Sequence, residues 1–271
     1  PPGKRHVIPD TPEARDDAIR KGAMFFTNNS FEKPYENSGA PEPHRWGEFT
    51  IDFDGPGALK DARDLVLVHL PDHYALDPYD LKFFMSGKKG LHIEAPAECF
   101  GAENGDTHLP KIWKRIASEF KTAFDLPTLD MSIYNMKSGK LWRIPNVKRS
   151  NGRYKVPIEL EELRDLSEAD LIELTKAPRE IDVINDDPPE VCPDLKNLYD
   201  DAKAFVYREQ KEKVESDPLT DEEKAKISKE IPACVRYVLK SCPTTDKTNF
   251  NKLVLNLCKY FICFFNLATI N

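Results

Sequence analysis

The stretch Phe49-Thr50-Ile51-Asp52-Phe53-Asp54 alternates apolar and polar side chains, which predicts a short β-strand with one buried face. Residues two apart in a strand point to the same side, so Asp52 and Asp54 should stand together before the turn signal Gly55-Pro56-Gly57. Neighbouring carboxylates repel unless a cation lies between them, and carboxylate oxygens suit Mg²⁺ or Mn²⁺. The alternative is that one Asp caps the next helix and the other faces water.

The chain has 271 residues and is 40% hydrophobic, enough for a buried core in one large or two smaller domains. Its net charge of −7 means that any nucleic-acid site must be a local basic patch. No apolar run approaches the ~20 residues that cross a bilayer, and the N-terminal sequence lacks the pattern of a signal peptide. The six cysteines show no CxxC spacing, which is typical of reduced thiols. We expect a cytoplasmic protein with no membrane partner, and the sequence does not decide whether it is a piece of a longer chain.

The hydrophobic pattern predicts an α+β body over residues 1–184, a linker over 185–193 and a small all-α C-terminal domain over 194–271. The linker is rich in Asp and Pro, and residues 31–46 look like a loop. Helices are expected at 10–22, 58–70, 110–125, after the capping box 167–170, and at 194–213, 220–229, 232–241 and 247–265. Besides the aspartate strand, strands are expected at 23–30, 81–85, 91–95, 129–134, 141–145 and 154–158.

A second constellation is the loop Ser86-Gly87-Lys88-Lys89-Gly90-Leu91-His92, between two short apolar runs. Glycines let a backbone approach a ligand, and a hydroxyl, two lysines and a histidine suit an anionic group such as a triphosphate. The alternative is a surface hairpin whose lysines keep it soluble, with His92 a packed strand residue. The loop does not follow the Walker A pattern.

Two further features extend the site. Asp130, at the start of an apolar run, is either a cap residue or a third carboxylate beside Asp52 and Asp54. Residues 131–158 contain no acidic residue and seven basic ones, with aromatic residues interleaved: Lys137, Lys140, Arg143, Lys148, Arg149, Arg153 and Lys155, with Tyr134, Trp142 and Tyr154. Such a strip favours a polyanion surface with bases stacked on rings, over a solvated hairpin pair.

Three acids, a cationic loop and a basic strip together fit nucleotidyl transfer. A two-metal site of Mg²⁺ or Mn²⁺ would activate the attacking hydroxyl and stabilise the pyrophosphate leaving group. Basic side chains would hold the triphosphate of a dNTP or NTP. The template-binding candidates in the basic strip are Lys148, Arg149, Arg153, Tyr154 and Lys155.

The order of these motifs resembles the archaeo-eukaryotic primase superfamily. Residues 51–57 and 86–93 are similar to its first two motifs, in particular in the polymerase domain of bacterial non-homologous end-joining ligases. Residues 129–134, followed by 141–146 and 149–154, look more like the third motif of primase-polymerases from plasmids, phages and CRISPR-associated operons. The resemblance covers roughly residues 20–180, and the second motif is its most specific part.

The resemblance implies two modules, one α/β and one like an RNA-recognition motif, with the cleft between them. It implies that Asp52, Asp54 and Asp130 are catalytic metal ligands. It also implies a set of contacts to the incoming nucleotide: Ser86 and His92, with Lys88, Lys89 and Arg143 as further triphosphate partners. Only Cys99 lies in the body, so a zinc-dependent role is not supported.

The C-terminal helices resemble domains that assist priming in primase-polymerases. Residues 231–235 are faintly similar to a cysteine segment that holds an iron–sulfur cluster in the primase large subunit. The cysteine spacings (Cys234, Cys242, Cys258 and Cys263) also fit the buried faces of helices, and we favour buried thiols over a cluster.

The sequence thus predicts a primase-polymerase that makes and extends primers on single-stranded DNA, with a helicase or other replication or CRISPR proteins as further partners. The alternatives are a gap-filling repair polymerase, a non-catalytic nucleic-acid-binding module and a metal-dependent nuclease. The nuclease would have no need of a triphosphate loop. The pattern does not decide between dNTPs and NTPs, DNA and RNA templates, or Mg²⁺ and Mn²⁺.

Overall fold

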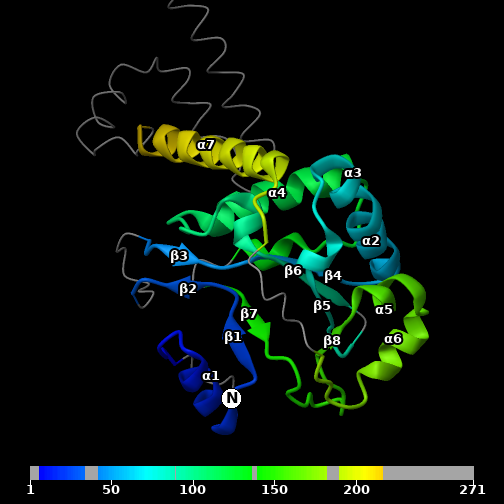
Figure 1. The fold of residues 1–271 in the computed structure, drawn as a ribbon. Helices are drawn as coiled ribbons and strands as arrows, with labels where there is room; N and C mark the ends of the chain where they lie inside the picture. Colours follow the sequence, from blue (N-terminus) through cyan, green and yellow to red (C-terminus); the bar gives the residue numbers. More distant parts are fainter. Residues whose placement is uncertain (1–5, 34–41, 89, 136–138, 182–188, 216–271) are drawn as a thin grey trace, which may run out of the picture. The chain divides into compact units, whose positions relative to one another are not determined.

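The computed structural model describes residues 6–33, 42–88, 90–135, 139–181 and 189–215. The chain divides into two compact units, Pro1–Glu212 and Lys213–Asn271, and the described residues lie almost entirely in the first. They combine helices with small antiparallel sheets, so the predicted α+β class is confirmed (Figure 1). The helices predicted at 220–229, 232–241 and 247–265 lie outside the described residues. None of the helices in the described ranges has the length and apolar character of a membrane span.

A four-stranded antiparallel sheet forms the centre of the first unit. Its strands, in spatial order, are β4 (Phe49–Phe53), β6 (Leu91–Ala95), β5 (Lys82–Met85) and β8 (Val156–Ile158). The register aligns Asp52 with His92, His92 with Phe84, and Phe84 with Pro157. Two smaller antiparallel pairs accompany it: β1 (Phe25–Thr27) with β7 (Leu141–Arg143), and β2 (Ser30–Phe31) with β3 (Arg45–Trp46).

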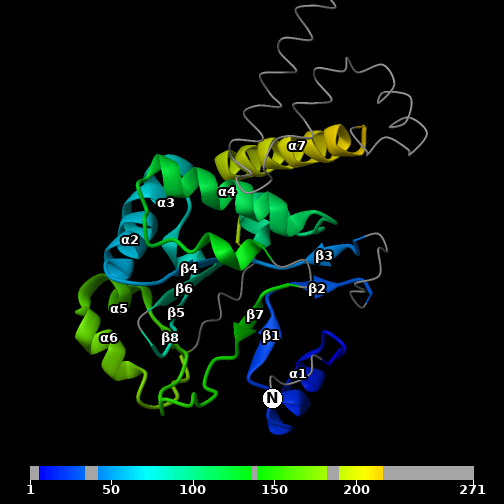
Figure 2. The ribbon, with the colours of Figure 1, turned by 180° about the vertical axis from the view of Figure 1, so that it is seen from behind.

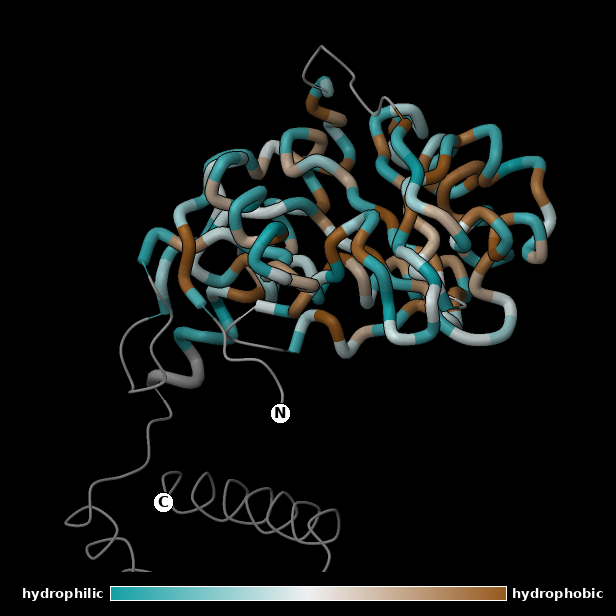
Figure 3. The backbone as a smooth tube through the Cα atoms, turned by 90° about the horizontal axis from the view of Figure 1, so that it is seen from below, coloured by the Kyte–Doolittle hydropathy of each residue, from teal (hydrophilic) through white to brown (hydrophobic). Residues whose placement is uncertain are grey.

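Strand alternation gives the central sheet one apolar and one polar face. Phe49, Ile51 and Phe53 of β4 are all buried in the hydrophobic core. The Phe49 ring lies 5.9 Å from that of Phe120 and 5.2 Å from that of Trp113, both on α4 (Leu109–Ala123). The side chains between them point to the opposite face, which is where the charged residues of β4 and β6 gather. In Figure 3 hydrophobic and hydrophilic colours change over short distances along the tube of the described residues.

The aspartate strand leads directly into helices on the apolar side. These are α2 (Ala58–Asp64), the π-helical segment η1 (Leu65–His69) and α3 (Leu70–Tyr74), which confirm the predicted helix at 58–70. Figure 2 shows α2, α3 and α4 together on one side of the sheet. The predicted helix at 110–125 is confirmed as α4. Its buried residues recur at helical spacing: Leu109, Ile112, Trp113, Ile116, Ala117 and Phe120.

Several of the remaining helices begin at side-chain caps. The Thr11 side chain accepts a hydrogen bond from the Ala14 amide (3.3 Å) at the start of α1 (Pro12–Arg20). Ser167 does the same for the Asp170 amide (3.2 Å) at the start of α6 (Glu168–Leu174), where a capping box is predicted. The other helical segments are η2 (Pro78–Asp80), η3 (Ala97–Phe100), η4 (Met131–Tyr134), α5 (Leu160–Asp165) and α7 (Pro193–Glu215).

Of the strands predicted after α4, one needs correction. The run predicted as a strand at 129–134 forms a single bridge, Leu129 to Phe53, and then turns into the 3₁₀ helix η4. The reason is that Asp130 acts as its cap and accepts from the Ser132 amide (2.8 Å). The strands predicted at 141–145 and 154–158 are confirmed as β7, which pairs with β1, and β8, which pairs with β5; between them Lys148 and Tyr154 form an isolated antiparallel bridge.

The division of the chain also differs from the prediction. The first compact unit continues to Glu212, so most of α7 belongs with the body and not with a separate domain. Leu195 of α7 is fully buried, and the Tyr199 ring lies 5.3 Å from the Trp113 ring of α4. At the end of the predicted linker, the Cys192 amide donates to the Cys99 carbonyl (3.0 Å). Both of these cysteines are buried free thiols, as expected, and the other four lie outside the described residues.

Candidate active site

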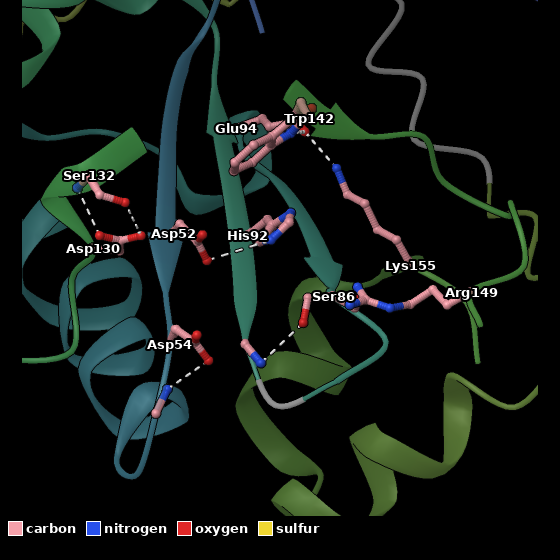
Figure 4. Close-up of polar contacts among 12 residues, drawn as sticks. Asp52, Asp54, Ser86, His92, Glu94, Asp130, Ser132, Trp142, Arg149 and Lys155 are labelled. Atoms are coloured by element: carbon pink, nitrogen blue, oxygen red, sulfur yellow. Dashed lines mark hydrogen bonds and ion pairs between the residues drawn. The ribbon is translucent and has the colours of Figure 1, made fainter. Parts of the chain in front are cut away.

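Asp52 and Asp130 are brought together by backbone pairing along the free edge of β4. The Asp130 amide donates to the Asp52 carbonyl (2.8 Å), and the Asp54 amide donates to the Thr128 carbonyl (3.1 Å). Buried Asp61 of α2 anchors this segment, because its carboxylate accepts from the Thr128 amide (3.0 Å) and hydroxyl (2.6 Å). The three acids predicted as ligands therefore come from one strand and the segment that pairs with it (Figure 4).

The acids influence one another electrostatically. Burial is the main cause that raises the pKa of Asp52 to about 7, and the charges of Asp130 and Asp54 raise it further. Lys140 and Lys155 offset part of this effect. Asp52 is thus a carboxyl group that is costly to ionise and that a nearby cation would return to the ionised form.

The donor set fits an oxygen-liganded divalent cation, although the side chains do not converge on one point. Within the described ranges, no three His, Cys, Asp or Glu side chains are arranged as a metal site. Asp130 also accepts two hydrogen bonds from Ser132, and Asp54 accepts one from the Gly55 amide (2.9 Å). Each carboxylate oxygen has a second lone pair, so these bonds leave capacity for a cation. Among the ion pairs of the described residues, Asp52 has only the contact with His92.

His92 of β6 stands opposite Asp52, with its Nε2 atom 3.5 Å from the Asp52 Oδ1 atom. Burial lowers the pKa of His92 well below its usual range, and the positive charges of Lys155, Arg149 and Arg143 lower it further. The imidazole is therefore neutral at physiological pH. It lies between the acidic cluster of β4 on one side and a group of basic side chains on the other.

The Ser86–Gly90 loop is a tight turn held by the chain that follows β7. The Ser86 amide donates to the Gly90 carbonyl (2.9 Å), and the Gly90 amide donates to the Ser86 hydroxyl (3.1 Å). Arg149 and Asn151 donate to the carbonyls of Ser86 (2.6 Å) and Gly87 (3.0 Å). A Cβ atom on Gly90 would lie 2.8 Å from the Phe53 carbonyl oxygen, so glycine allows the loop to meet the end of the aspartate strand.

The residues predicted to contact phosphate or template differ in their exposure and in their partners. Lys88 and Lys148 are exposed, and Lys89 lies outside the described residues. The Arg143 guanidinium lies 4.2 Å from the Phe25 ring, and its buried Nη1 atom has no hydrogen-bond partner in the described part of the chain. Neighbouring Arg149 adds to the burial that lowers the pKa of Arg143. Two guanidinium groups that repel each other in this way make a suitable place for an anion.

Three residues predicted to contact the template have structural partners. Arg153 donates to the Ile172 carbonyl (2.7 Å) and the Thr175 hydroxyl (2.9 Å), which ties it to α6. Tyr154 is only partly exposed and packs against the core. Lys155 does not lie on a basic surface: it is 1% exposed and its Nζ atom donates to Glu94 (3.1 Å). The position of Lys155 next to β8 turns its side chain onto the polar face of the sheet.

Glu94 and the partners of Trp142 are parts of the site that the sequence interpretation missed. Glu94 accepts from the Trp142 indole (2.5 Å), and one face of the Trp142 ring stacks on His92 with the ring centroids 4.1 Å apart. A cleft of about 700 Å³ lies beside them, lined by Glu48, Thr50, Lys82, Glu94, Trp142 and Arg143 among others. The alternation of Leu91-His92-Ile93-Glu94-Ala95 could have placed Glu94 on the same face as His92.

Comparison with known proteins identifies no relative of this chain, so its function is inferred from its fold and site geometry. No protein-family model matches the chain, and no curated protein and no solved structure matches it.

Proposed function

We propose that the protein is a metal-dependent nucleotidyltransferase of the primase-polymerase kind, which makes and extends primers on single-stranded DNA from dNTPs or NTPs. The observation that carries the proposal is the division of charge around His92. Asp52, with Asp54 and Asp130 beside it, lies on one side, and Lys155 and Arg149 lie on the other (Figure 4), with Arg143 close enough for its charge to act on the imidazole. A nucleoside triphosphate needs this combination of acids for cations and bases for phosphates.

Asp52, Asp54 and Asp130 would hold Mg²⁺ or Mn²⁺, which supplies charge neutralisation and hydroxyl activation at the reacting phosphate. The chain's own groups orient the substrate. Neutral His92 can donate a hydrogen bond to a phosphate oxygen without competing for the carboxylates as a cation would. Arg143 offers a guanidinium nitrogen that has no partner in the described part of the chain, and exposed Lys88 of the Ser86–Gly90 loop offers an ammonium group. The exposed Lys148 and the neighbouring loop would meet the template backbone.

The architecture supports a place for this body in the archaeo-eukaryotic primase superfamily. In this proposal, the catalytic core comprises an α/β module and a module like an RNA-recognition motif. The supporting feature is the central antiparallel sheet, which has helices on one face (Figure 1) and the charged residues on the other. The C-terminal residues would assist priming, and a helicase or other replication proteins are the partners that this function requires.

The test is incorporation of labelled dNTPs and NTPs on unprimed and primed single-stranded templates, with Mg²⁺ or Mn²⁺. Products on both templates are expected, and the preferred nucleotide would be read from the same experiment. Products on the primed template alone would indicate a gap-filling polymerase. Binding of DNA with no product on either template would overturn the proposal in favour of a non-catalytic nucleic-acid-binding module.

A further inference from the structure

Trp142 joins the candidate active site to a buried ion pair. Its ring stacks on His92 with centroids 4.1 Å apart and planes inclined by 29°. On its other side, its indole N–H donates to Glu94 Oε1 at 2.5 Å, and the same oxygen accepts from Lys155 Nζ at 3.1 Å. Figure 4 shows Trp142 and Glu94 side by side with Lys155 reaching toward them, and His92 on the side of the pair that faces Asp52.

His92 lacks the second hydrogen bond that usually fixes a functional imidazole. Its Nδ1 atom is buried and has no partner in the described part of the chain, and its other nitrogen has only the 3.5 Å contact with Asp52. A hydrogen bond on the far nitrogen normally sets the orientation of such a ring. Here the flat face of Trp142 is what lies against the ring.

Glu94 in turn fixes Trp142. It occupies the same face of β6 as His92, two residues further along the strand. Its carboxylate is 14% exposed and the Lys155 side chain is 1% exposed, so an ion pair has been taken out of water at a real cost. The Lys155 ammonium also lies 4.1 Å from the Phe84 ring and 5.0 Å from the Trp142 ring. The pair therefore contacts the indole at two places: Glu94 accepts the hydrogen bond from the indole N–H, and the Lys155 ammonium lies near the indole ring.

We propose that Trp142 is a positioning residue for nucleoside triphosphate binding, anchored by Glu94 and acting through the orientation of His92. The proposal rests on the proposed function, because it assigns a role within the same site. Trp142 comes from β7, which pairs with β1 and not with the central sheet. The orientation of His92 thereby depends on how the β1–β7 pair docks onto the polar face.

The test is a double-mutant cycle between Trp142→Leu and His92→Ala on the full chain. The readout is the Kd of a labelled, non-hydrolysable nucleoside triphosphate with Mn²⁺, which requires no turnover. Trp142→Leu should weaken binding about tenfold in the wild-type background and less than about twofold in the His92→Ala background. Trp142→Phe keeps a ring on His92 and should restore binding to within about threefold of wild type.

Independent, additive losses in the two backgrounds would overturn the proposal, because they would mean that Trp142 does not act through His92. Leu141→Ala, on the same short strand and 40% exposed, is the matched control and should leave the Kd unchanged. If Trp142→Leu fails to fold, Glu94→Ala combined with Lys155→Met removes the anchor and leaves no unpaired ammonium. That variant should bind about fivefold more weakly, and unchanged binding would contradict the anchoring role.

The outcomes separate this proposal from the proposed function. A wild-type protein that binds no triphosphate would overturn both. A wild-type protein that binds it with additive mutant effects would overturn the role of Trp142 alone.

Discussion

At the scale of single residues, Asp52 connects the stability of the protein with its proposed activity. Its pKa is about 7 in the folded protein, against about 3.9 in an unfolded chain. Between these values the folded state binds more protons than the unfolded state, so the free energy of unfolding falls as pH rises from about 4 to about 7. Ionised Asp52 therefore destabilises the fold, as expected for a carboxylate that binds a cation.

Asp52→Asn should relieve this cost where Asp52 is ionised. We expect the substitution to increase the free energy of unfolding by roughly 2–3 kcal/mol more at pH 8 than at pH 5, in the absence of divalent cations. Urea unfolding of both proteins at the two pH values measures the difference. An equal effect at both pH values would mean that the carboxyl group ionises normally in the folded protein.

At the scale of elements, the Ser86–Gly90 turn should require a glycine at position 87. Gly87 has a φ of 74°, and a Cβ atom there would collide with the Tyr154 carbonyl oxygen. Gly87→Ala should therefore destabilise the fold by about 3 kcal/mol, through both strain and the clash. Gly152 is the matched control, because its φ is 81° but an added Cβ meets nothing within 4 Å. Gly152→Ala should cost about 1 kcal/mol, and equal losses of stability in thermal unfolding would contradict the packing argument.

The elements that were predicted correctly are those with a local signal. Phe49–Phe53 alternates strictly, and α4 repeats its apolar residues at helical spacing, so neither needs information from distant residues. The strand prediction at 129–134 was wrong because a short apolar run has the same composition in a strand and in a short helix. There the cap at Asp130 decides the outcome.

Long-range pairing was the part of the site that the sequence could not reveal. Nothing near Trp142 indicates that β7 pairs with β1, more than 110 residues earlier in the chain. That pairing puts Trp142 on His92. The burial of Lys155 has a similar origin, because its partner Glu94 comes from a different strand of the sheet.

At the scale of the whole molecule, α7 should be part of the body's folding unit. Leu195 is fully buried in the core of the first compact unit. Leu195→Ala should lower the free energy of unfolding of that unit by about 2–5 kcal/mol. Exposed Asp201 on the same helix is the control, and Asp201→Ala should change it by less than about 0.5 kcal/mol. If Leu195→Ala left the unfolding of the body unchanged, a domain boundary near residue 184 would be correct after all.

The central claim is that the acids of the aspartate strand carry nucleotidyl transfer. The most direct measurement compares the wild-type protein with the Asp52→Ala, Asp54→Ala double variant in nucleotide incorporation on a single-stranded template with Mn²⁺. DNA binding is measured in parallel. We predict that the double variant binds DNA with wild-type affinity and makes no product, because the cation ligands are lost while the basic residues remain. Synthesis retained by the double variant would contradict the account.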